Sequence, residues 1–494
     1  MQAVTLQRNL PYSFAKRYGV YLSWPEEGAP IATLRPGSPP EAVAEVARFV
    51  QGPFVIEQKP AADFEQGLAE AYARDSAMTQ QMVEDLGDEL DLASIADSVP
   101  QTEDLLDKDN DAPIIRLINA LLSEAVKQGA SDIHIETFEK RLVVRFRIDG
   151  VLREVVQPKR ELAPLLVSRI KVMARLDIAE KRVPQDGRIS LRLANQEIDV
   201  RVSTMPSNSG ERVVMRLLDK QAGRLKLSSL GMTADMQDRF AELLRRPYGI
   251  LLVTGPTGSG KTTTLYAGLS EINNETRNIL TVEDPIEYNL EGIGQTQVNV
   301  KADMTFARGL RAMLRQDPDV VMVGEIRDRE TAEIAVQASL TGHLVLSTLH
   351  TNTAVGAMTR LRDMGIEPFL IASSLVGVLA QRLIRVLCPV CKVAHQPNSF
   401  ERDFLRLGSD EKITLYRPAG CDACNQRGFR GRAGLYELLL VDDTVRGMIH
   451  DAATEETIVH HIRATSPSIR GDGRLKIRAG LTTVEEVLRV TEEG

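Results

Sequence analysis

The hydrophobic and polar positions of the 494-residue chain form three folded regions with different patterns. Residues 1–82 contain short apolar runs of mixed spacing, which predict a small mixed domain. In residues 114–220, a helical pattern over 114–130 precedes short Val-, Ile- and Arg-rich segments, which predicts a compact α+β domain. In residues 225–494, apolar strand-like runs alternate with helical segments, which predicts a larger α/β domain built on a sheet.

An acidic segment separates the first region from the second. Residues 83–113 carry eleven Asp and Glu residues and a single Lys. Such a stretch repels itself and has too little apolar surface to fold alone, so the composition predicts a flexible linker. We expect this linker to be a domain boundary.

The overall composition excludes several classes of protein. The chain has 60 Lys and Arg residues against 68 Asp and Glu, a net charge of −8, which argues against a globally basic nucleic-acid-binding protein. The longest weakly polar run, Phe369 to Ala380, is shorter than the ~20 residues of a membrane-spanning helix. The first residues also lack the apolar core of a signal peptide. We therefore expect a cytoplasmic protein that meets a membrane only through a partner or its own surface.

A glycine-rich motif in the largest region predicts a nucleotide site. The segment GPTGSGKT follows an apolar strand-like run and precedes a helical segment, which is the complete phosphate-loop pattern in its required context. Backbone N–H groups would surround the phosphates of ATP, Lys261 would reach the β- and γ-phosphates, and the Thr262 hydroxyl would bind Mg²⁺. The predicted nucleotide-binding residues are Gly255, Pro256, Thr257, Gly258, Ser259, Gly260, Lys261, Thr262 and Thr263.

Carboxylates that follow two predicted strands are candidates for the chemistry of hydrolysis. Glu283, Asp284 and Glu287 could hold Mg²⁺ through water or orient the attacking water, although an ordinary acidic loop has the same composition. A second apolar run ends in Gly324-Glu325, where P-loop enzymes usually place an Asp that binds Mg²⁺. This departure leaves Glu325 as the candidate general base.

Two histidines flank a third strand-like run. In TGHLVLSTLH, Ser347 and Thr348 end a buried strand, a usual place for a γ-phosphate sensor, and His343 and His350 stand on either side. This spacing fits a structural role and a role in the nucleotide site equally well. We include His343 among the candidate catalytic residues.

Arginines are expected near the nucleotide, because phosphoryl transfer develops negative charge that they can neutralise. Arg308, Arg311 and Arg315 are spaced by three and four residues, which places them on one face of a helix. Arg201 and Arg216 lie on predicted strands of the preceding domain. These side chains would form a clamp over the nucleotide, or else ordinary solvated faces.

All four cysteines of the chain occur in two CxxC pairs. Cys388 and Cys391 are separated by twenty-nine residues from Cys421 and Cys424. Four thiolates with this spacing predict a closed tetrahedral Zn²⁺ site that stabilises a short insert, residues 385–434. A redox function is the minor alternative, because redox motifs usually contain a single CxxC.

The region around the cysteines is locally basic. Residues 381–434 contain ten Lys and Arg against five Asp and Glu. This excess could contact nucleic acid, anionic lipid headgroups or an acidic partner, or it could be a solvated face. The scarcity of aromatic residues there argues against base stacking.

Together these motifs resemble the secretion ATPase superfamily, which includes the motors of type II secretion, type IV pilus assembly and conjugation. The resemblance is carried by GPTGSGKT, TVEDPIEY, LRQDPDVVMVGEIRD, TGHLVLSTLH and the CxxC pairs, with GASDIHIE and RFRIDG upstream. The opening LPYSFAKRYGV is most similar to the type II secretion ATPase family, the GspE family. The Gly at position 324 is usual in that family.

The resemblance implies a multidomain α/β protein with a RecA-like P-loop domain, a preceding PAS-like α+β domain, a small N-terminal domain and a tetracysteine zinc insert. It implies a hexameric ATPase that binds ATP, Mg²⁺ and Zn²⁺ and drives pseudopilus assembly and protein export through a type II secretion system. It also implies that residues 1–82 dock on an inner-membrane platform protein from the cytoplasmic side. By the same resemblance Glu325 is the catalytic carboxylate, and the phosphates contact Arg201, Arg216, Arg311 and Arg315.

Two other functions stay open. The first is another motor, either for type IV pilus assembly or for DNA translocation or conjugation. A DNA-translocating or conjugation motor would grip nucleic acid with the basic zinc region, but the negative net charge and the few aromatic residues argue against nucleic acid. A nucleotide-gated assembly scaffold would bind ATP with only incidental turnover. The complete set of Lys261, Thr262 and Glu325 argues for hydrolysis.

Overall fold

The computed structural model divides the chain into two compact units, Met1–Asp91 and Leu92–Gly494. The described residues are 10, 18–23, 29–50, 52–60, 64, 112–193, 196–219, 226–408 and 410–491. The predicted acidic linker therefore lies outside the described residues up to position 111.

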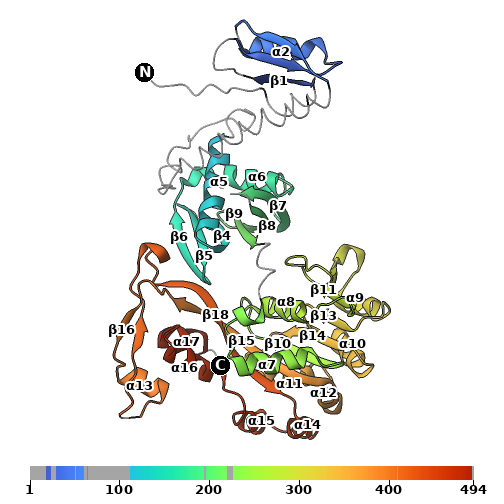
Figure 1. Ribbon diagram of the computed structural model, residues 1–494, viewed down its shortest axis with the longest axis vertical. Coiled ribbons are helices and arrows are strands. Elements are labelled where there is room, and N and C mark those ends of the chain that lie inside the picture. Colours follow the sequence, from blue (N-terminus) through green and yellow to red (C-terminus); the bar gives the residue numbers. More distant parts are fainter. Residues whose placement is uncertain are drawn as a thin grey trace. The chain divides into compact units, whose positions relative to one another are not determined.

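The first unit contains a three-stranded sheet and a helix, drawn in blue in Figure 1. Its elements are β1 (Val20–Ser23), β2 (Ile31–Leu34), α2 (Pro40–Val50) and β3 (Val55–Gln58). The middle strand, β2, is antiparallel to β1 and parallel to β3. Ala42 and Val46 lie one turn apart on α2 and are buried with Leu22 of β1, because an amphipathic helix places such positions on one face.

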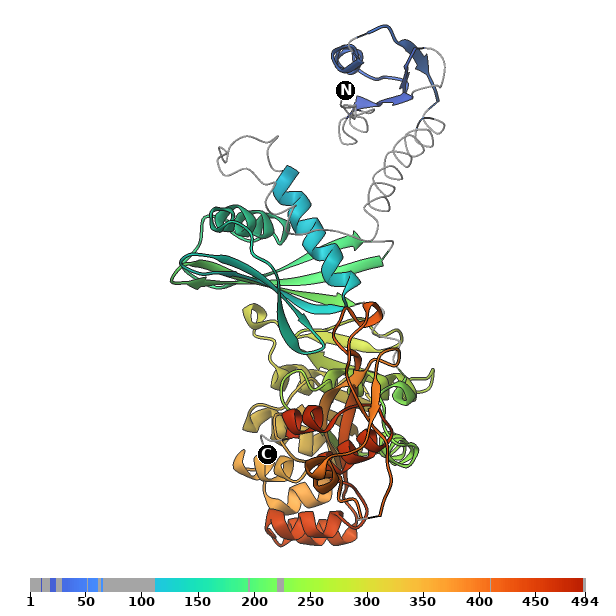
Figure 2. The same cartoon turned by 90° about the vertical axis from the view of Figure 1, so that its left-hand side faces the viewer.

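The second unit begins with a six-stranded antiparallel sheet and two helices, which Figure 2 shows on the same side of the sheet. The elements are α5 (Ala112–Lys127), β4 (Ala130–Thr137), β5 (Leu142–Ile148), β6 (Val151–Val156), η1 (Arg160–Leu162), α6 (Ala163–Met173), β7 (Gln185–Leu193), β8 (Gln196–Ser207) and β9 (Gly210–Asp219). The strand order is β6-β5-β4-β9-β8-β7. Leu117 and Leu121 of α5 are buried against Ile133 and Ile135 of β4. This arrangement confirms the predicted α+β fold.

The largest domain is built around a seven-stranded sheet. In spatial order its strands are β12 (Gly294–Gln297), β11 (Ile279–Glu283), β13 (Val320–Val323), β14 (Leu344–Leu349), β10 (Gly249–Thr254), β15 (Leu375–Leu387) and β18 (Phe429–Leu440). The first six strands are parallel, and β18 is antiparallel to β15. A parallel sheet places the carboxyl ends of its strands at one edge, where ligands bind in such folds.

Helices cover both faces of this sheet. Helices α7 (Ala234–Leu244) and α8 (Lys261–Ile272), with η3 (Leu227–Ser229), pack on one face. On the other face lie α9 (Phe306–Met313), α10 (Arg329–Leu340), α11 (Gly356–Asp363) and α12 (Pro368–Ser374). Successive side chains of a strand point to opposite faces, so Leu251 of β10 packs with the first group and Leu252 with the second.

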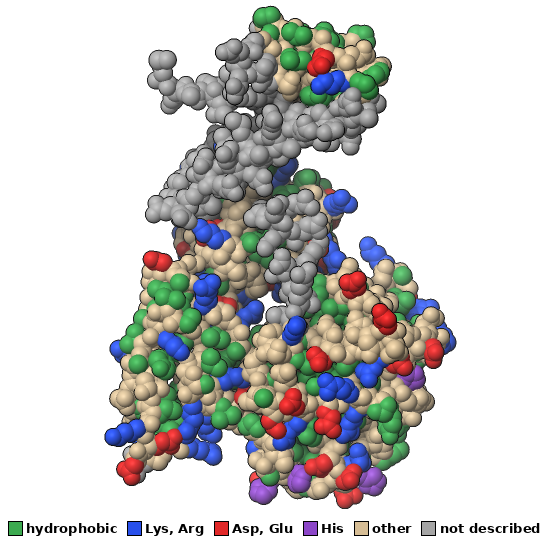
Figure 3. Space-filling view, in the orientation of Figure 1, with side chains coloured by type: hydrophobic (Ala, Val, Ile, Leu, Met, Phe, Trp, Pro, Cys, Tyr) green, Lys and Arg blue, Asp and Glu red, His purple; other side chains and the backbone are tan. Residues whose placement is uncertain are grey.

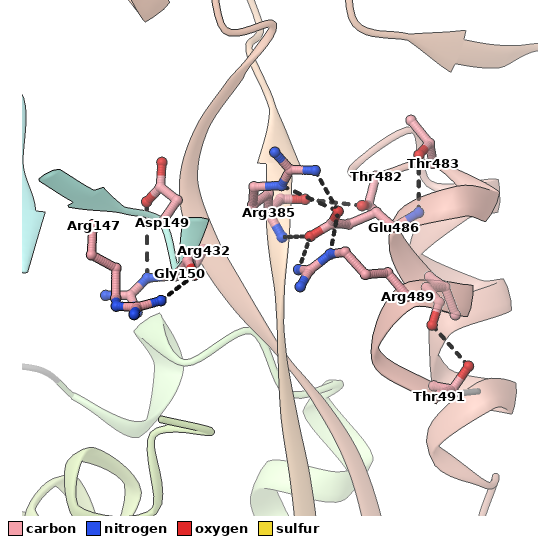
Figure 4. Close-up of polar contacts among 11 residues, drawn as sticks. Arg147, Asp149, Gly150, Arg385, Arg432, Thr482, Thr483, Glu486, Arg489 and Thr491 are labelled. Atoms are coloured by element: carbon pink, nitrogen blue, oxygen red, sulfur yellow. Dashed lines mark hydrogen bonds and ion pairs between the residues drawn. The ribbon is translucent and has the colours of Figure 1, made fainter. Parts of the chain in front are cut away.

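The carboxyl-terminal part of the chain adds an insert and four helices. The insert contains β16 (Val393–His395), α13 (Ser399–Leu405), β17 (Leu415–Arg417) and η5 (Asp422–Cys424), and it connects β15 to β18. The helices are α14 (Asp443–His450), α15 (Glu455–Ile462), α16 (Ile469–Arg478) and α17 (Val484–Thr491). Figure 4 shows how α17 is held against β15: the buried Glu486 accepts hydrogen bonds from the Arg385 backbone and side chain and from Arg489.

No helix in the described part of the chain is long and apolar enough to cross a membrane. The weakly polar run from Phe369 to Ala380 is divided between α12 and β15.

Most predicted elements are present, with two differences. The run over 114–130 is α5 with an end at Lys127, and the apolar runs of the largest domain are β10, β11, β13 and β14. The hydrophobic pattern did not reveal β4 as a strand. Helix α9 ends at Met313, so Arg315 lies beyond it and does not share its face with Arg308 and Arg311.

Candidate active site

A cavity of about 1050 Å³ lies between the six-stranded sheet domain and the carboxyl edge of the large sheet. The six-stranded sheet domain contributes Gly129, Ser131 and Arg216 to the wall of the cavity, and the large domain contributes the phosphate loop. The lining from the large domain also includes Glu283, Asp284, Glu287, Glu325, Thr348 and His350. Most of the predicted nucleotide site is therefore brought together here.

The phosphate loop connects the end of β10 to the first residue of α8. Gly255 and Gly260 both have positive φ values, +150° and +87°, which side chains rarely adopt. A Cβ atom at Gly255 would lie 2.4 Å from the Gln381 carbonyl oxygen, and one at Gly260 would lie 2.8 Å from the Gln381 amide nitrogen. The two glycines are required because the loop turns against β15.

Gln381 of β15 packs against the phosphate loop, and the sequence did not predict it as a residue of the site. Its side-chain amide donates to the Ser259 carbonyl at 2.6 Å and accepts from the Thr264 hydroxyl at 2.8 Å. It is 1% exposed, so these hydrogen bonds are shielded from water. No local sequence signal marks this residue, because its partners lie more than a hundred positions away.

Lys261 is the first residue of α8 and is largely buried. Its ammonium group donates to the carbonyl oxygens of Gly255, at 2.8 Å, and Pro256, at 3.1 Å. Burial lowers the pKa of Lys261 to about 8, although the negative charge of Glu325 opposes the shift. The group that is predicted to bind phosphates is thus held by the loop itself and faces the cavity.

Glu325 follows β13 at the carboxyl edge of the sheet. Its side chain is 12% exposed and is contacted by Arg327 at 2.5 Å and by His350 Nε2 at 3.2 Å. The hydrogen bond to Glu325 raises the pKa of Arg327, so this arginine stays charged. Arg327 was not among the predicted site residues. Both partners fix the orientation of the carboxylate.

Gly324 shows why the usual Asp is absent before Glu325. A Cβ atom at this position would lie 3.3 Å from the Phe306 ring and 3.4 Å from the Glu283 Cα. A carboxylate would need still more room, which the close approach of α9 and β11 does not provide.

His343, a predicted catalytic residue, does not line the cavity among the described residues. This residue precedes β14, and its carbonyl accepts a hydrogen bond from Gly249, the first residue of the parallel strand β10. Its ring lies 2.9 Å from the Ala338 carbonyl at the end of α10. His343 is therefore at the amino edge of the sheet, and His350, at the carboxyl end of the same strand, is the histidine in the cavity.

The two serine and threonine candidates at the end of β14 differ in position. The buried Ser347 hydroxyl donates to the Val323 carbonyl, and the Thr348 hydroxyl donates to the Gly324 carbonyl at 2.8 Å. Only Thr348 lines the cavity.

Glu283 is buried at the end of β11 and is almost fully engaged. Its carboxylate accepts hydrogen bonds from Tyr266, from Thr281 at 2.5 Å and from the Gln295 amide at 3.0 Å. Burial and the neighbouring Glu283 charge raise the pKa of Tyr266, so the phenol remains a donor. This network makes Glu283 a rigid part of the wall.

Glu287 is a different kind of carboxylate. Burial raises its pKa, while the positive charges of Arg216 and Arg201 oppose that increase. These arginines are cross-strand neighbours on β9 and β8, which brings them to the same part of the sheet. The positive charge of the six-stranded sheet domain therefore acts on a carboxylate of the large domain.

The predicted arginines divide into two groups. Arg216 lines the cavity, and Arg201 acts electrostatically on the same wall. By contrast, Arg311 pairs with Glu330 at 2.6 Å, and Arg315 donates to the Arg311 carbonyl at 2.8 Å. Arg308 pairs with Asp303. None of these three is among the described residues that line the cavity.

A turn of the six-stranded sheet domain also contacts the large domain. Asp149, between β5 and β6, lies 3.7 Å from Arg427 and 3.9 Å from Arg432. Figure 4 shows Asp149 close to Arg432, with Gly150 of the same turn and Arg147 of β5 nearby. Because Arg432 also lines the cavity, this contact lies at its border.

The four cysteines form one cluster in the insert. All four sulfur atoms lie within 4.8 Å of one another, with Cys388 and Cys421 at 3.9 Å and Cys391 and Cys424 at 3.8 Å. Tetrahedral Zn²⁺ with Zn–S bonds of about 2.3 Å places its sulfur ligands about 3.8 Å apart, so the cluster fits zinc. A disulfide needs about 2.05 Å, and the structure contains none among these thiols.

Backbone N–H groups point at the sulfur atoms, as expected for thiolates. Gly428 donates to Cys424 at 3.1 Å, and Gly420 donates to Cys391 at 3.3 Å. Burial would raise the pKa of Cys424, but the N–H donors of Cys421 and Gly428 prevail and lower it to about 6. The pKa of Cys421 is instead raised to about 12, by burial and by its hydrogen bond with Cys391, so the proton is kept on one thiol of the pair and removed more easily from the other.

Basic side chains of the insert do not gather into one patch on the face seen in Figure 3. There, Lys and Arg side chains are spread singly over the lobe that contains β16 and α13, among apolar and acidic ones. This distribution gives no direct indication of a nucleic-acid surface.

Comparison with known proteins places the chain in a family. The family model described as "Type II/IV secretion system protein" matches residues 107–489, and a model for an amino-terminal domain of "GSPII protein E" matches residues 9–72. Type II secretion system protein E of Pseudomonas aeruginosa is 64% identical over 486 residues, 98% of this chain and 97% of that protein. Type II secretion system ATPase E of Vibrio cholerae is 63% identical over 490 residues, 99% of this chain and 97% of that protein.

Solved structures support the same assignment. The ATPase DotB of Legionella pneumophila is similar with a TM-score of 0.57 and 21% identity, over 77% of this chain and 96% of that one, and this likeness shows the fold. The pilus retraction motor PilT, solved with bound ADP, has a TM-score of 0.52 and 27% identity over 75% and 95% of the two chains. They confirm the predicted multidomain α/β, RecA-like architecture. The chain therefore belongs to the type II secretion ATPase family and is a P-loop ATP hydrolase.

Proposed function

We propose that the chain hydrolyses ATP with Mg²⁺ to drive pseudopilus assembly and protein export through a type II secretion system. The observation that carries the proposal is the shared cavity, which is lined by the phosphate loop, by Glu325 and by Arg216 of a different domain. Family membership supplies the biological setting, since relatives of 64% and 63% identity are named for type II secretion.

In the proposed reaction the phosphate loop holds ATP and Lys261 contacts the β- and γ-phosphates. The Thr262 hydroxyl would be the protein ligand for Mg²⁺, which neutralises phosphate charge when bound. Water attacks the γ-phosphorus, the bond to the β–γ bridging oxygen breaks, and Glu325 accepts the proton from the water. Arg327 and His350 keep the Glu325 carboxylate in one orientation during this step.

The arginines of the six-stranded sheet domain would complete the nucleotide site when ATP binds. Arg216 lines the cavity and Arg201 is its cross-strand neighbour, and both would neutralise charge on the phosphates. Closure of residues 114–220 over the loop would exclude water and couple hydrolysis to domain rotation. Arg311 and Arg315 remain proposed phosphate ligands. They can reach a phosphate only after their segment moves, or from a neighbouring subunit.

The proposed assembly is a hexameric ring peripheral to the cytoplasmic face of the inner membrane. The first unit, which matches the amino-terminal domain model of GSPII protein E, would dock on an inner-membrane platform protein. Anionic lipid is a further proposed contact of the basic insert, and we do not expect nucleic acid. Zn²⁺ held by the four cysteines would be structural, because all four ligand positions come from the protein.

The test is the ATPase rate with Mg²⁺ under three conditions. The full chain would be assayed alone, with duplex or single-stranded DNA, and with anionic vesicles carrying the cytoplasmic domain of the platform protein. Stimulation only by the vesicles and partner supports the secretion motor. Stimulation by DNA would instead support a DNA-translocating motor, and binding of ATP with negligible turnover in every condition would support a nucleotide-gated scaffold.

A further inference from the structure

One face of the six-stranded sheet carries two buried carboxylates on a single strand. Asp132, His134 and Glu136 alternate along β4 and point away from the helices that cover the other face. Asp132 is 4% exposed and Glu136 is 3% exposed. Buried carboxylates are stable only when they are paired and hydrogen-bonded, so their partners determine what they do.

Each carboxylate lies between two arginines from the neighbouring strands β5 and β9. Asp132 accepts a hydrogen bond from Arg216 Nε at 2.8 Å, and Arg147 Nε lies 3.7 Å away on its other side. Glu136 forms ion pairs with Arg145 and Arg212. Both sites thus place a buried carboxylate between an arginine of β5 and an arginine of β9 on the same face of β4, although the Glu136 contacts are ion pairs without a hydrogen bond.

Their arginine partners differ in one respect. Arg216 lines the nucleotide cavity, whereas Arg145 and Arg212 are not among the lining residues. The residue next to Asp132, Ser131, also lines the cavity, and its hydroxyl donates to the second Asp132 oxygen at 2.8 Å. Of these two sites, the Asp132 site is therefore the one that connects the buried sheet face to the nucleotide.

The way in which Asp132 binds Arg216 leaves the outer edge of the guanidinium for another ligand. The carboxylate engages Nε, and within the described part of the chain neither Nη group of Arg216 donates a hydrogen bond. A guanidinium is planar, so a fixed Nε also fixes the direction of both Nη groups. Arg147, held by the Gly150 carbonyl at 3.0 Å (Figure 4), closes the opposite side of Asp132.

We propose that Asp132 is a positioning residue that holds Arg216 in the orientation needed to contact the phosphates of ATP. The Arg216 side chain is 56% exposed and would otherwise sample many rotamers. A charge that is oriented before the reaction contributes more to catalysis than one that must reorganise, because the cost of ordering it is already met. This inference rests on the proposed contact between Arg216 and the phosphates.

Four variants of the full chain test this proposal: Asp132→Asn, Glu136→Gln, Arg216→Ala and the double variant of Asp132→Asn with Arg216→Ala. Each would be assayed for kcat, KM and melting temperature with Mg²⁺ and ATP. Asp132→Asn keeps the size and an acceptor oxygen but removes the charge. Glu136→Gln is the matched control, because it removes an equally buried carboxylate with two arginine partners on the same strand.

We expect Asp132→Asn to lower kcat about tenfold with a smaller change in KM, because a misplaced group weakens the transition state more than ground-state binding. Glu136→Gln should keep kcat within about twofold of the unmodified chain, because its arginine partners do not line the cavity. In the Arg216→Ala background, Asp132→Asn should have no further effect, since Asp132 acts through that arginine. If Asp132→Asn does not fold, Asp132→Glu, which moves the carboxylate by one methylene, replaces it in the same scheme.

The outcomes separate the two proposals. If Arg216→Ala retains full kcat, the proposed role of Arg216 in hydrolysis is wrong. If Arg216→Ala is slow but Asp132→Asn is normal, only the positioning role of Asp132 is overturned. An equal loss of kcat in Glu136→Gln, or an undiminished effect of Asp132→Asn without Arg216, would also overturn it, because both results indicate a general structural role.

Discussion

The two walls of the nucleotide cavity are built in contrasting ways. The wall of the large domain is a continuous stretch of backbone, the phosphate loop, whose shape is set by Gly255, Gly260 and the supporting Gln381. The facing wall is a sheet surface on which Arg216 is held by a buried carboxylate from another strand. The residues that form the first wall are consecutive in the sequence and are supported by Gln381 of a distant strand, whereas the second wall depends on pairing between positions 84 residues apart.

This contrast indicates which parts of the site tolerate movement. The loop and Lys261 belong to one rigid strand–loop–helix unit, so they keep their geometry when the domains separate. The proposed contact of the arginine wall with the nucleotide would require the two domains to be together. We therefore expect the loop wall to determine whether ATP binds, and the arginine wall to determine how fast it is hydrolysed.

The strongest test of the comparison is Lys261→Ala. The variant removes the only charged group of the loop, so we expect a loss of ATPase activity of about 10³-fold together with a clear loss of ATP affinity. The measurements are steady-state hydrolysis and binding of a fluorescent ATP analogue. Retained affinity in a folded variant would show that the loop wall does not dominate binding.

Glu325→Gln should separate binding from chemistry within the same wall. The amide cannot accept a proton, so hydrolysis should fall by about 10²-fold or more while ATP affinity is kept. Binding of the analogue and single-turnover hydrolysis measure the two properties independently. Full activity of this variant would mean that another carboxylate, such as Glu287, is the base.

The pH dependence of ATP binding should distinguish the walls more finely. Because burial lowers the pKa of Lys261 to about 8, the group is charged at about pH 7 and largely neutral at about pH 9. If only the charged form binds phosphate, affinity should fall about tenfold between these values. Arg216→Ala should show the same decrease, because arginine stays charged over this range. A pH-independent affinity would contradict the assignment to Lys261.

The smallest expected effect concerns the arginine wall itself. Burial, reinforced by Arg147 and Arg212, lowers the pKa of His134, although Asp132 and Glu136 oppose the shift. The unfolded chain therefore binds the proton more readily than the folded chain. As a result, the free energy of unfolding is highest above about pH 6.5 and decreases as the pH falls below it. His134→Gln should remove this pH dependence, which for one histidine with an unfolded-state pKa of about 6.5 is at most about 1.4 kcal/mol in the free energy of unfolding between about pH 7.5 and 5.5. Unaltered pH dependence in the variant would exclude His134 as its source.

The contrast between the walls also explains how much the sequence could reveal. The phosphate loop was predicted in full, because phosphate binding demands consecutive residues of fixed type. Glu325 and the cysteine cluster were likewise found where their short motifs place them. The sequence did not distinguish His343 from His350: in a parallel sheet the carboxyl ends of the strands face the phosphate loop, and His350 lies at that end of β14.

Other parts of the site had no local signal. Gln381 contacts the phosphate loop from a strand more than a hundred residues later, and its neighbours in the sequence do not distinguish it. The pairing of Asp132 with Arg216 depends on the register of β4 with β9, and the sequence pattern did not reveal β4 as a strand. The Arg311 and Arg315 spacing looked helical, but α9 ends between them.

The cysteine cluster has a consequence for quantitative chemistry of the protein. The chain has four cysteines, and all of them belong to this one cluster. If the cluster binds Zn²⁺ as proposed, four thiols that react with a colorimetric reagent correspond to one metal-free site, with no background from elsewhere in the chain. A fully loaded preparation should titrate near zero and a chelator-treated one near four, with one zinc released for every four thiols gained.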